Sequence, residues 1–387
     1  MNPKLLLICL VFFLLFMGAG AIQPYLTPYF QEKCGMSPGT AAFIVALVYY
    51  TFAVMRFFSG YTVNRIGVKT SIAVGALFYF FFVTATAFFP SCFISSGAAV
   101  LWGIGAALLW TGSSAYILNI SREGRYGFSA GLHRLSLQAG LIIGFLTLAE
   151  LIHTRNSYAG GFRFAVFACA AGFICTLFLA RMSRGPQFIS FRSLFRDFLS
   201  RKLLTVSGYL FVTGISYGII LNVFNRFVRG MYGYSSYKYT LVLFYVAGGL
   251  SSFLMGSLSD RKGRGMVISC GFACGMAAAL ITVFSHSLVS LAVSSFLLGI
   301  MFQSVPTAVT ARIGDTVSPE QRPAVIARVF VWRDAGIAAA IQTAGFFKAE
   351  TGDVTRLFSI FLPLFTAACI ISVFETSGNR RREGAGR

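Results

Sequence analysis

Charged side chains are scarce in this chain. Only 11% of its 387 residues are Asp, Glu, Lys or Arg, whereas a soluble domain carries about 25%. Hydrophobic residues make up 56%, and the 42 Phe and 40 Gly suit helices that pack against each other in lipid. The composition therefore excludes an ordinary soluble domain and predicts an all-α polytopic membrane protein.

Several sequence patterns that support chemistry are also missing. No Gly-Lys-Ser or Gly-Lys-Thr phosphate loop and no Cys-x-x-Cys pair occurs, and no apolar run carries a metal-ligand cluster or a nucleophile beside a base. We therefore expect no enzyme activity, no metal and no cofactor. Six of the eight Cys lie in apolar runs; Cys34 and Cys92 fall in predicted external loops, where a disulfide is an open alternative.

Acidic residues are the rarest charged group, with 12 Asp and Glu against 32 Lys and Arg and a net charge of +20. A basic balance can indicate nucleic-acid binding. Here the basic residues lie in short loops between apolar runs, which is how orientation is encoded in a membrane. We therefore expect a lipid bilayer as the surroundings and no nucleic-acid partner.

Twelve apolar runs are long enough to cross a bilayer, which takes roughly 20 residues per helix. They lie at about 4–30, 38–63, 68–89, 93–119, 127–152, 159–182, 203–226, 236–258, 265–285, 288–311, 323–347 and 354–375. The first run continues past the small-residue pattern Ala19-Gly20-Ala21, so we interpret it as an uncleaved span and not as a signal peptide.

The basic residues test this count. With the N-terminus inside, the inner segments hold 20 Lys and Arg and the outer segments hold 8. The remaining four, Arg56, Arg134, Arg328 and Arg333, fall within runs. This bias supports an even number of spans and both termini in the cytoplasm. We expect the protein in the plasma membrane.

A charged, glycine-punctuated turn occurs twice, 196 residues apart. The copies are Gly256-Ser-Leu-Ser-Asp260-Arg261-Lys262-Gly263-Arg264 and Gly60-Tyr-Thr-Val-Asn64-Arg65-Ile-Gly67-Val68-Lys69. Three further landmarks recur at offsets of 196 to 198: Gln138-Ala-Gly140 with Asp334-Ala-Gly336, Glu123-x-Arg125 with Glu320-x-Arg322, and Gly35-Met-Ser37 with Gly233-Tyr-Ser235. The repeat predicts two similar six-helix bundles.

The predicted bundles cover residues 1–182 and 203–375, followed by a basic cytoplasmic tail at 376–387. Between the bundles lies a cytoplasmic linker at 183–202, in which apolar residues recur every three or four positions. That spacing fits an amphipathic helix on the inner membrane surface, and a plain linker is the alternative.

The residues of the two turns resemble the signature of the major facilitator superfamily of secondary transporters, G-x-x-x-D-R-x-G-R-(K/R), and the resemblance covers essentially the whole chain. The second copy keeps Gly256, Asp260, Arg261, Gly263 and Arg264, and the first keeps Gly60, Arg65, Gly67 and Lys69. Asn64 and Val68 stand in the first copy where the family has Asp and Arg. Ser318-Pro-Glu320-Gln-Arg322 is similar to the family's loop before helix 11.

The resemblance implies that the turns latch the two halves at the inner face. Asp260, with Arg261 or Arg264, can form charge-assisted hydrogen bonds to a neighbouring helix or a helix end. The latch must break when the inner side opens, so it should be worth only a few kcal/mol. Because Asn64 lacks the negative charge, we expect the C-terminal copy to be stronger. The alternative is that these charges only set topology and end helices.

Asp334 is the only acid at mid-depth of a predicted span. Intramembrane ionisable residues are costly and are therefore candidates for function. Asp334 can carry a proton, with a static ion pair as the alternative. His133 is a second candidate for proton coupling, although a lone helical His is more often only hydrogen-bonded.

The resemblance implies that helices 1, 4, 7 and 10 line a central cavity, and polar residues of helices 5 and 11 are added as candidates. The predicted lining residues are Gln23, Trp110, Thr111, Arg134, Gln138, Asn222, Asn225, Arg226, Gln303, Arg328, Trp332 and Arg333. Ala99 stands where many proton-coupled exporters of the family have an Arg, ahead of a stretch similar to Gly103-Ile-Gly105-Ala106-Ala107, which weakens a drug/proton antiporter assignment.

The sequence therefore favours a monomeric secondary transporter that works by alternating access and exports a small apolar or amphiphilic molecule in exchange for protons. A carrier of a small organic anion is the alternative, because Arg134, Arg328 and Arg333 outnumber Asp334. A third interpretation, a membrane sensor or partner subunit without transport, has no need of an intact latch motif.

Overall fold

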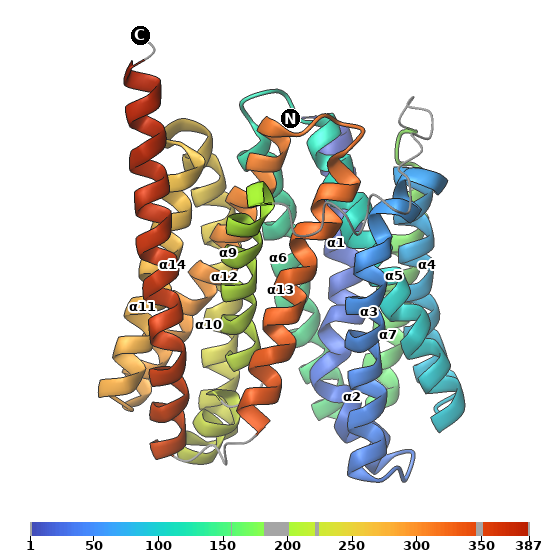
Figure 1. Cartoon of the computed structure of the whole chain (residues 1–387). Coiled ribbons are helices and arrows are strands. Elements are labelled where there is room, and N and C mark those ends of the chain that lie inside the picture. The colour runs from blue at the N-terminus through green and yellow to red at the C-terminus, as the bar shows by residue number, and fades with distance from the viewer. Residues whose placement is uncertain (1, 156, 182–200, 221–223, 346–350, 386–387) are drawn as a thin grey trace. The chain divides into compact units, whose positions relative to one another are not determined.

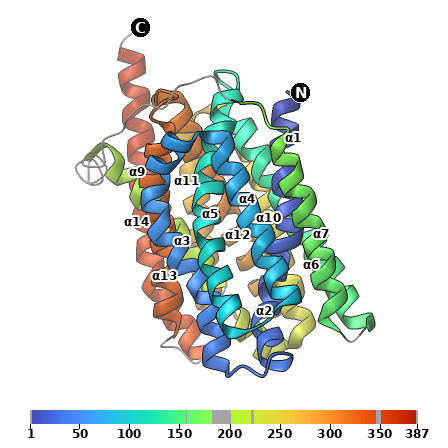
Figure 2. The same cartoon turned by 90° about the vertical axis from the view of Figure 1, so that its right-hand side faces the viewer.

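The computed structural model describes residues 2–155, 157–181, 201–220, 224–345 and 351–385. In these ranges all regular structure is helical and no strand occurs, which confirms the predicted all-α fold. The contacts divide the chain into two compact units, described below, and within each unit the long helices run side by side (Figures 1 and 2). They are α1 (Pro3–Leu15), the π-helix η1 (Phe16–Gly20), α2 (Ala21–Glu32), α3 (Pro38–Ile66), α4 (Val68–Phe88), α5 (Cys92–Ile120), α6 (Tyr126–Arg155), α7 (Tyr158–Leu177), α9 (Arg201–Ile219), α10 (Asn225–Lys262), α11 (Arg264–Phe284), α12 (Leu288–Thr316), α13 (Arg322–Gly345) and α14 (Thr351–Ala385).

Ten spans in the described ranges are long and apolar enough to cross a membrane, and they coincide with ten of the twelve predicted runs. In the predicted run 203–226, the described residues form a shorter apolar helix, Leu203–Ile219, and positions 221–223 lie outside the description. Residues 323–345 of the predicted run 323–347 lie in α13, which carries Arg328, Arg333 and Asp334 within a few turns, and positions 346–347 lie outside the description. The predicted linker 183–202 lies outside the described residues except for its last two positions, so its two alternatives stay open.

Local sequence explains where several helices begin. Ser37 and Ser91 each precede the first turn of a helix, and their hydroxyls accept the backbone N–H of Thr40 and of Ile94, both at 3.2 Å. These caps satisfy donors that have no partner within the helix.

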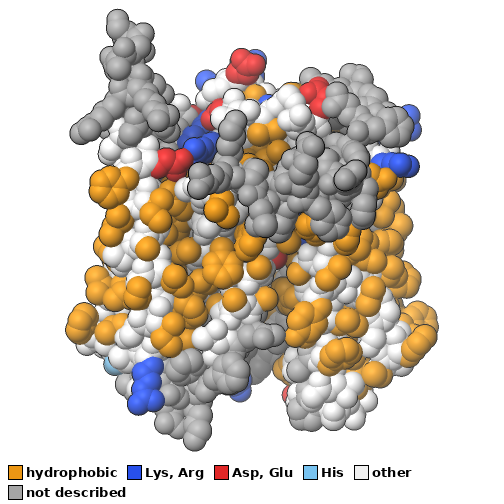
Figure 3. Space-filling model, viewed as in Figure 1, with side chains coloured by type: hydrophobic (Ala, Val, Ile, Leu, Met, Phe, Trp, Pro, Cys, Tyr) orange, Lys and Arg blue, Asp and Glu red, His pale blue; other side chains and the backbone are white. Residues whose placement is uncertain are grey.

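The lipid-facing surface is apolar. Phe93, Phe284 and Phe167 are 89%, 81% and 75% exposed, which suits hydrocarbon surroundings and would be costly in water. Figure 3 shows hydrophobic side chains over the middle of the helices, with Lys, Arg, Asp and Glu toward the helix ends.

The described contacts divide the chain into two compact units. The first comprises Met1–Ser121, Ser136–Asp197 and Val317–Arg328, and the second comprises Arg122–Leu135, Phe198–Thr316 and Val329–Arg387. In the first unit α5 packs against α3 and α4, and α4 packs against α7. In the second, α12 packs against α10 and α11, and α11 packs against α14. The same packing pattern therefore occurs in both units.

Two helices contribute to both units. The first turns of α6, within Arg122–Leu135, belong to the second unit by their contacts, and the first turns of α13, within Val317–Arg328, belong to the first. The bundle boundaries predicted from sequence stay a prediction, because they describe the order along the chain and not these contacts.

The repeat is visible in the backbone. Gly67 lies between α3 and α4 with φ 88° and ψ 151°, and Gly263 lies between α10 and α11 with φ 96° and ψ 150°. A positive φ of this kind favours glycine, because a Cβ would be strained there. The landmarks Gly35 and Gly233 also share a positive φ, at 61° and 80°.

Candidate functional site

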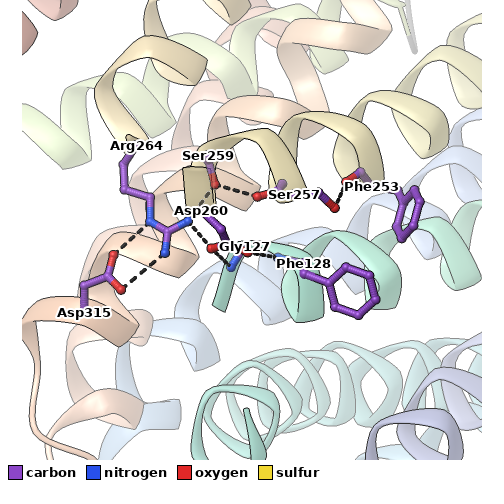
Figure 4. Close-up of polar contacts among 9 residues, drawn as sticks. Gly127, Phe128, Phe253, Ser257, Ser259, Asp260, Arg264 and Asp315 are labelled. Carbon is purple, nitrogen blue, oxygen red and sulfur yellow. Dashed lines mark hydrogen bonds and ion pairs between the residues drawn. The ribbon is translucent and has the colours of Figure 1, made fainter. Parts of the chain in front are cut away.

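The C-terminal copy of the turn binds the start of α6. The backbone N–H groups of Gly127 and Phe128 donate to the two carboxylate oxygens of Asp260 at 2.9 and 2.7 Å (Figure 4). All three residues belong to the second unit. The first N–H groups of a helix lack partners within the helix and carry partial positive charge, so a carboxylate is a favourable acceptor for them.

Arg264 holds this carboxylate in place. Its Nη1 donates to Asp260 and to the hydroxyl of Ser259, and its Nε and Nη2 donate to the carboxylate of Asp315 in the last turn of α12 at 2.8 and 3.2 Å (Figure 4). Sequence reasoning named Arg261 or Arg264 for this role. The structure places Arg264 in the contact and leaves Arg261 exposed.

Two glycines let the helices come this close. A Cβ on Gly127 would lie 2.2 Å from the carbonyl oxygen of Gly256, and a Cβ on Gly256 would lie 2.4 Å from the carbonyl oxygen of Gly127. Real Cβ atoms do not approach backbone this closely, so both positions require glycine in this arrangement. We call Gly127, Phe128, Gly256, Asp260, Arg264 and Asp315 the C-terminal contact.

The N-terminal copy makes the equivalent backbone contact with the start of α13. A Cβ on Gly60 would lie 2.7 Å from the Cα of Ala324 and 2.9 Å from the carbonyl oxygen of Pro323. Asn64 stands where the other copy has Asp260, and its buried Nδ2 has no hydrogen-bond partner in the described part of the chain. Arg65 is exposed, 5.3 Å from the ring centroid of Tyr61.

The cation of this copy comes from α13. The guanidinium of Arg322 is buried and donates from Nη1 to the carbonyl oxygen of Leu118 and to Oδ1 of Asn119, both at 2.9 Å. These acceptors lie in the last turn of α5, where carbonyl groups lack helical partners. We call Gly60, Asn64, Asn119, Arg322, Pro323 and Ala324 the N-terminal contact, all of it in the first unit.

A second group of polar residues is buried inside the second unit. Arg134 in α6 donates from Nη1 to Oε1 of Gln303 in α12 at 2.9 Å, and its guanidinium carbon lies 5.8 Å from the ring centroid of Phe330. The guanidinium carbon of Arg333 lies 4.3 Å from the ring centroid of Phe302. The structure therefore brings three predicted cavity residues, Arg134, Gln303 and Arg333, onto neighbouring parts of α6, α12 and α13.

The predicted proton carriers lie beside these arginines in sequence. His133 and Asp334 are buried, at 4% and 8% exposure. Trp332 is half-buried. A charged group in such surroundings must be compensated by partners, because burial of an isolated charge is very costly.

Predicted cavity residues of the first unit lie on several helices. Gln23 accepts from the hydroxyl of Tyr49 at 3.0 Å, and Thr111 shares a hydrogen bond of 2.7 Å with Ser59. Trp110 makes edge-on contacts with Phe12 and Phe16, at centroid distances of 5.5 and 5.6 Å. Trp110 is thus part of an aromatic cluster at the π-helix η1.

The remaining predicted residues divide into three groups. Gln138 and Arg328 are buried in the first unit, at 1% and 9% exposure. Arg226 is exposed at the start of α10. Asn222 and the side chain of Asn225 lie outside what the structure describes, so their predicted role stays a prediction.

Sequence reasoning missed Asp315 and the contact made by Arg322. The repeat contained the signal for both. Asp315 and Asn119 are 196 residues apart, as are Asp260 and Asn64. At both pairs of equivalent positions, the C-terminal half of the sequence has an acid where the N-terminal half has an amide. Arg56, 2% exposed with its guanidinium carbon 5.0 Å from the ring centroid of Phe52, was recognised only as a cation within a span.

In the described ranges, no group of three or more His, Cys, Asp or Glu side chains could hold a metal ion. Cys34 and Cys92 are free thiols, so the disulfide alternative is not realised in this structure. Burial raises the pKa of the Cys34 thiol, which keeps it protonated.

Apolar helices of membrane-spanning length, repeated in two similar units, define a multi-pass helical membrane protein. A sequence model of the Major Facilitator Superfamily matches residues 8–248 and 232–386. The chain therefore belongs to the Major Facilitator Superfamily, the family that the residues of the two turns indicated.

Curated relatives are similar over part of their length. Multidrug resistance protein 1 of Bacillus subtilis is 29% identical over 196 residues, which cover 48% of this chain and 47% of that protein. Multidrug efflux protein YfmO of the same organism is 29% identical over 136 residues, covering 35% and 34%. UNC93-like protein 3 of Arabidopsis thaliana is 26% identical over 176 residues, covering 46% and 32%. The chain spans less than half the length of these relatives.

Solved structures share the fold over the whole chain. The human organic anion transporter MFSD10 has a TM-score of 0.79 at 14% identity, covering 96% of this chain and 100% of that one. The transporter FucP in its outward conformation has a TM-score of 0.75 at 15% identity, covering 97% and 98%. At these identities the likeness establishes the fold alone.

Proposed function

We propose that this protein is a secondary transporter that carries a small organic anion with an apolar body by alternating access. The supporting observation is the set of charged side chains buried in the described residues. Five are arginines and one is an acid: Arg56, Arg134, Arg322, Arg328, Arg333 and Asp334.

This imbalance favours an anionic substrate. Arginine stays protonated in proteins, so burial does not remove its charge. The buried cations outnumber the buried acid, and an excess of positive charge favours the binding of an anion. The apolar and aromatic side chains around these residues suit an apolar body of that anion.

The direction and setting of transport are parts of the same proposal. We infer export, because two relatives are named as multidrug resistance and efflux proteins. We infer that both termini lie in the cytoplasm, in keeping with the basic-residue asymmetry of the sequence. A monomer in the plasma membrane is part of the same proposal.

The two contacts described above serve as the gate in this proposal. The start of α6 must leave the end of α10, and the start of α13 must leave the end of α3, when the cytoplasmic side opens. The support is that each contact joins helices from opposite halves of the sequence through hydrogen bonds or close glycine packing that can separate without breaking a helix.

A second candidate function is proton-coupled export of a small apolar or amphiphilic molecule, including lipophilic cations. The names of the efflux relatives favour it, and the buried Asp334 and His133 supply groups that can carry a proton.

Purified protein in liposomes with an internal pH dye separates the two. Benzoate, 1-naphthoate and tetraphenylphosphonium are added separately, to wild type and to Asp334→Asn. Uptake of the two anions without the cation supports the anion carrier. Substrate-dependent proton flux with the cation, lost in Asp334→Asn, supports the second candidate. Failure to move any probe, in protein that elutes as a folded monomer, counts against both.

A further inference from the structure

We propose that Arg134, Gln303 and Arg333 form the site that binds the anionic group, and that its ligand is an aromatic monocarboxylate or monosulfonate. This assignment rests on the anion transport proposed above and adds to it the residues and the substrate class.

The three side chains converge. Gln303 accepts from Arg134 at 2.9 Å, and the neighbouring residue Phe302 lies under the guanidinium of Arg333, 4.3 Å from ring centroid to Cζ. On α13, Phe330 contacts Arg134 and lies one turn before Arg333. The contacts thus form a closed cycle through α6, α12 and α13, all within the second unit.

Each of the two guanidinium groups lies against a phenyl ring. The ring of Phe330 contacts Arg134 and the ring of Phe302 contacts Arg333, so an aromatic face fixes one side of each group. A guanidinium presents its N–H groups in a planar fork that matches a carboxylate or sulfonate. The aromatic contacts orient the two guanidinium groups before a ligand binds, and the amide of Gln303 can add a donor.

The charges of these side chains favour a monoanion. Arg134 and Arg333 supply two positive charges, and Asp334, the residue after Arg333, supplies one negative charge, so these three side chains sum to one positive charge. One negative charge on the ligand makes the site neutral. A monoanion therefore fits better than a dianion or a cation.

Aromatic side chains beside Arg333 suit an aromatic body of the ligand. The Phe302 ring stacks on Tyr217 of α9, with centroids 4.4 Å apart and planes at 13°, and Phe244 of α10 lies 5.5 Å from Phe302. These three rings form an aromatic shelf beside Arg333. An aromatic ring attached directly to the carboxylate or sulfonate would contact the shelf while its anionic group meets the forks.

The test measures binding of radiolabelled 1-naphthoate to the full-length protein in detergent, with displacement by benzenesulfonate, hexanoate and 1-naphthylmethanol. We expect the sulfonate to compete, hexanoate to compete more weakly, and the uncharged alcohol not to compete. Arg134→Gln and Arg333→Gln should each weaken binding at least 30-fold. Arg333→Lys keeps the charge and loses the fork, and should weaken it about 10-fold.

Phe302→Leu provides a second line of test that leaves every charge in place. It should weaken binding of naphthoate several-fold more than binding of hexanoate, because only the aromatic ligand uses the shelf. Arg356→Gln, at an exposed position of α14 in the same unit, is the matched control and should bind as wild type.

The outcomes separate this inference from the function on which it rests. If wild type neither binds nor transports any of the anions, the anion-carrier function fails and this site fails with it. If wild type transports anions while Arg333→Lys and Phe302→Leu, eluting as folded monomers, bind naphthoate like wild type, the function stands and this site is overturned. Equal displacement by the uncharged alcohol also overturns it.

Discussion

The two contacts at the glycine turns share their backbone packing and differ in their chemistry. Gly256 lies against the carbonyl oxygen of Gly127, and Gly60 lies against that of Pro323. In the C-terminal contact the side chain one turn further on is Asp260, which accepts two backbone N–H groups. In the N-terminal contact it is Asn64.

The difference extends to four positions at the same offset of 196 residues. Four residues of the C-terminal contact each have a counterpart, 196 positions away, in the N-terminal copy that cannot make the same interaction. The pairs, with the residue of the C-terminal contact first, are Asp260 and Asn64, Arg264 and Val68, Asp315 and Asn119, and Gly127 and Pro323. Proline has no backbone N–H, so the start of α13 lacks a donor that the start of α6 supplies. An acid at position 64 would therefore find one donor fewer than Asp260 finds.

The comparison teaches that one backbone geometry can be held in two ways. The C-terminal contact uses a charged acceptor supported by an arginine, and hydrogen bonds to charged groups are worth about 1.5–3 kcal/mol each. The N-terminal contact uses close packing and one arginine that donates to neutral acceptors. We therefore expect the C-terminal contact to be the stronger one and to dominate the energy of opening.

Hydrogen–deuterium exchange compares the two contacts within one molecule. It reads the opening of the backbone amides of Gly127 and Phe128 at the start of α6, and of Ala324 at the start of α13. Local opening free energies appear directly as protection.

The largest expected effect comes from Gly256→Ala. Its Cβ would lie 2.4 Å from a backbone oxygen, which cannot rotate away, so α6 and α10 must move apart. We expect the contact to lose about 3 kcal/mol, on the scale of severe overpacking, and amide exchange at the start of α6 to rise roughly 100-fold.

The matched control for this change is Gly208→Ala, because a Cβ at Gly208 in α9 meets nothing within 4 Å. It should leave exchange at both contacts unchanged. Protection at the start of α6 that survives Gly256→Ala would show that the close approach is not needed for the contact.

Asp260→Asn should have the next largest effect, because it converts the stronger contact to the chemistry of the weaker one. An amide offers one acceptor oxygen, so one of the N–H groups of Gly127 and Phe128 loses its partner, which costs about 2 kcal/mol. Exchange at the start of α6 should rise roughly 30-fold while exchange at the start of α13 stays the same. An equal rise at both starts would indicate that the contacts are not independent.

The lengths of the helices and the positions of the turns could largely be predicted from the sequence. The apolar runs at 68–89 and 265–285 correspond to α4 and α11, because bilayer thickness sets the length of a span. Gly67 and Gly263 marked the turns, because few other residues adopt their backbone conformation. Helix ends and turns are local features, and local sequence specifies them.

The partners of the charged residues could not be predicted in the same way. That Asp260 binds the start of α6, and that Arg322 binds the end of α5, depends on how helices far apart in sequence pack together. The acid-to-amide differences at the repeat offset pointed to a difference in strength, and only the structure supplies the donors that explain it.

Arg322→Gln should have a smaller effect, confined to the N-terminal contact. The change removes the donor to the carbonyl oxygen of Leu118 and to Asn119, two neutral acceptors in the last turn of α5, and should cost about 1.5 kcal/mol. Exchange at Ala324 should rise roughly 10-fold. Arg163→Gln, at an exposed position of α7 in the same unit, is the control. No change at Ala324 would mean that Arg322 does not hold this contact.

The double substitution Asn64→Asp with Pro323→Ala should have the smallest effect and the most specific one. It gives the N-terminal contact the carboxylate and the N–H donor that this contact lacks. Asn64→Asp alone should change little, since Pro323 supplies no N–H. Pro323→Ala alone should also change little, since Asn64 is a poor acceptor for two donors. Together they restore a carboxylate opposite two helix-start N–H groups, and we expect a favourable coupling of about 1 kcal/mol in a double-mutant cycle, seen as a roughly fivefold gain of protection at Ala324. Strictly additive changes would show that the two contacts differ for a reason other than the lost charge and the lost donor.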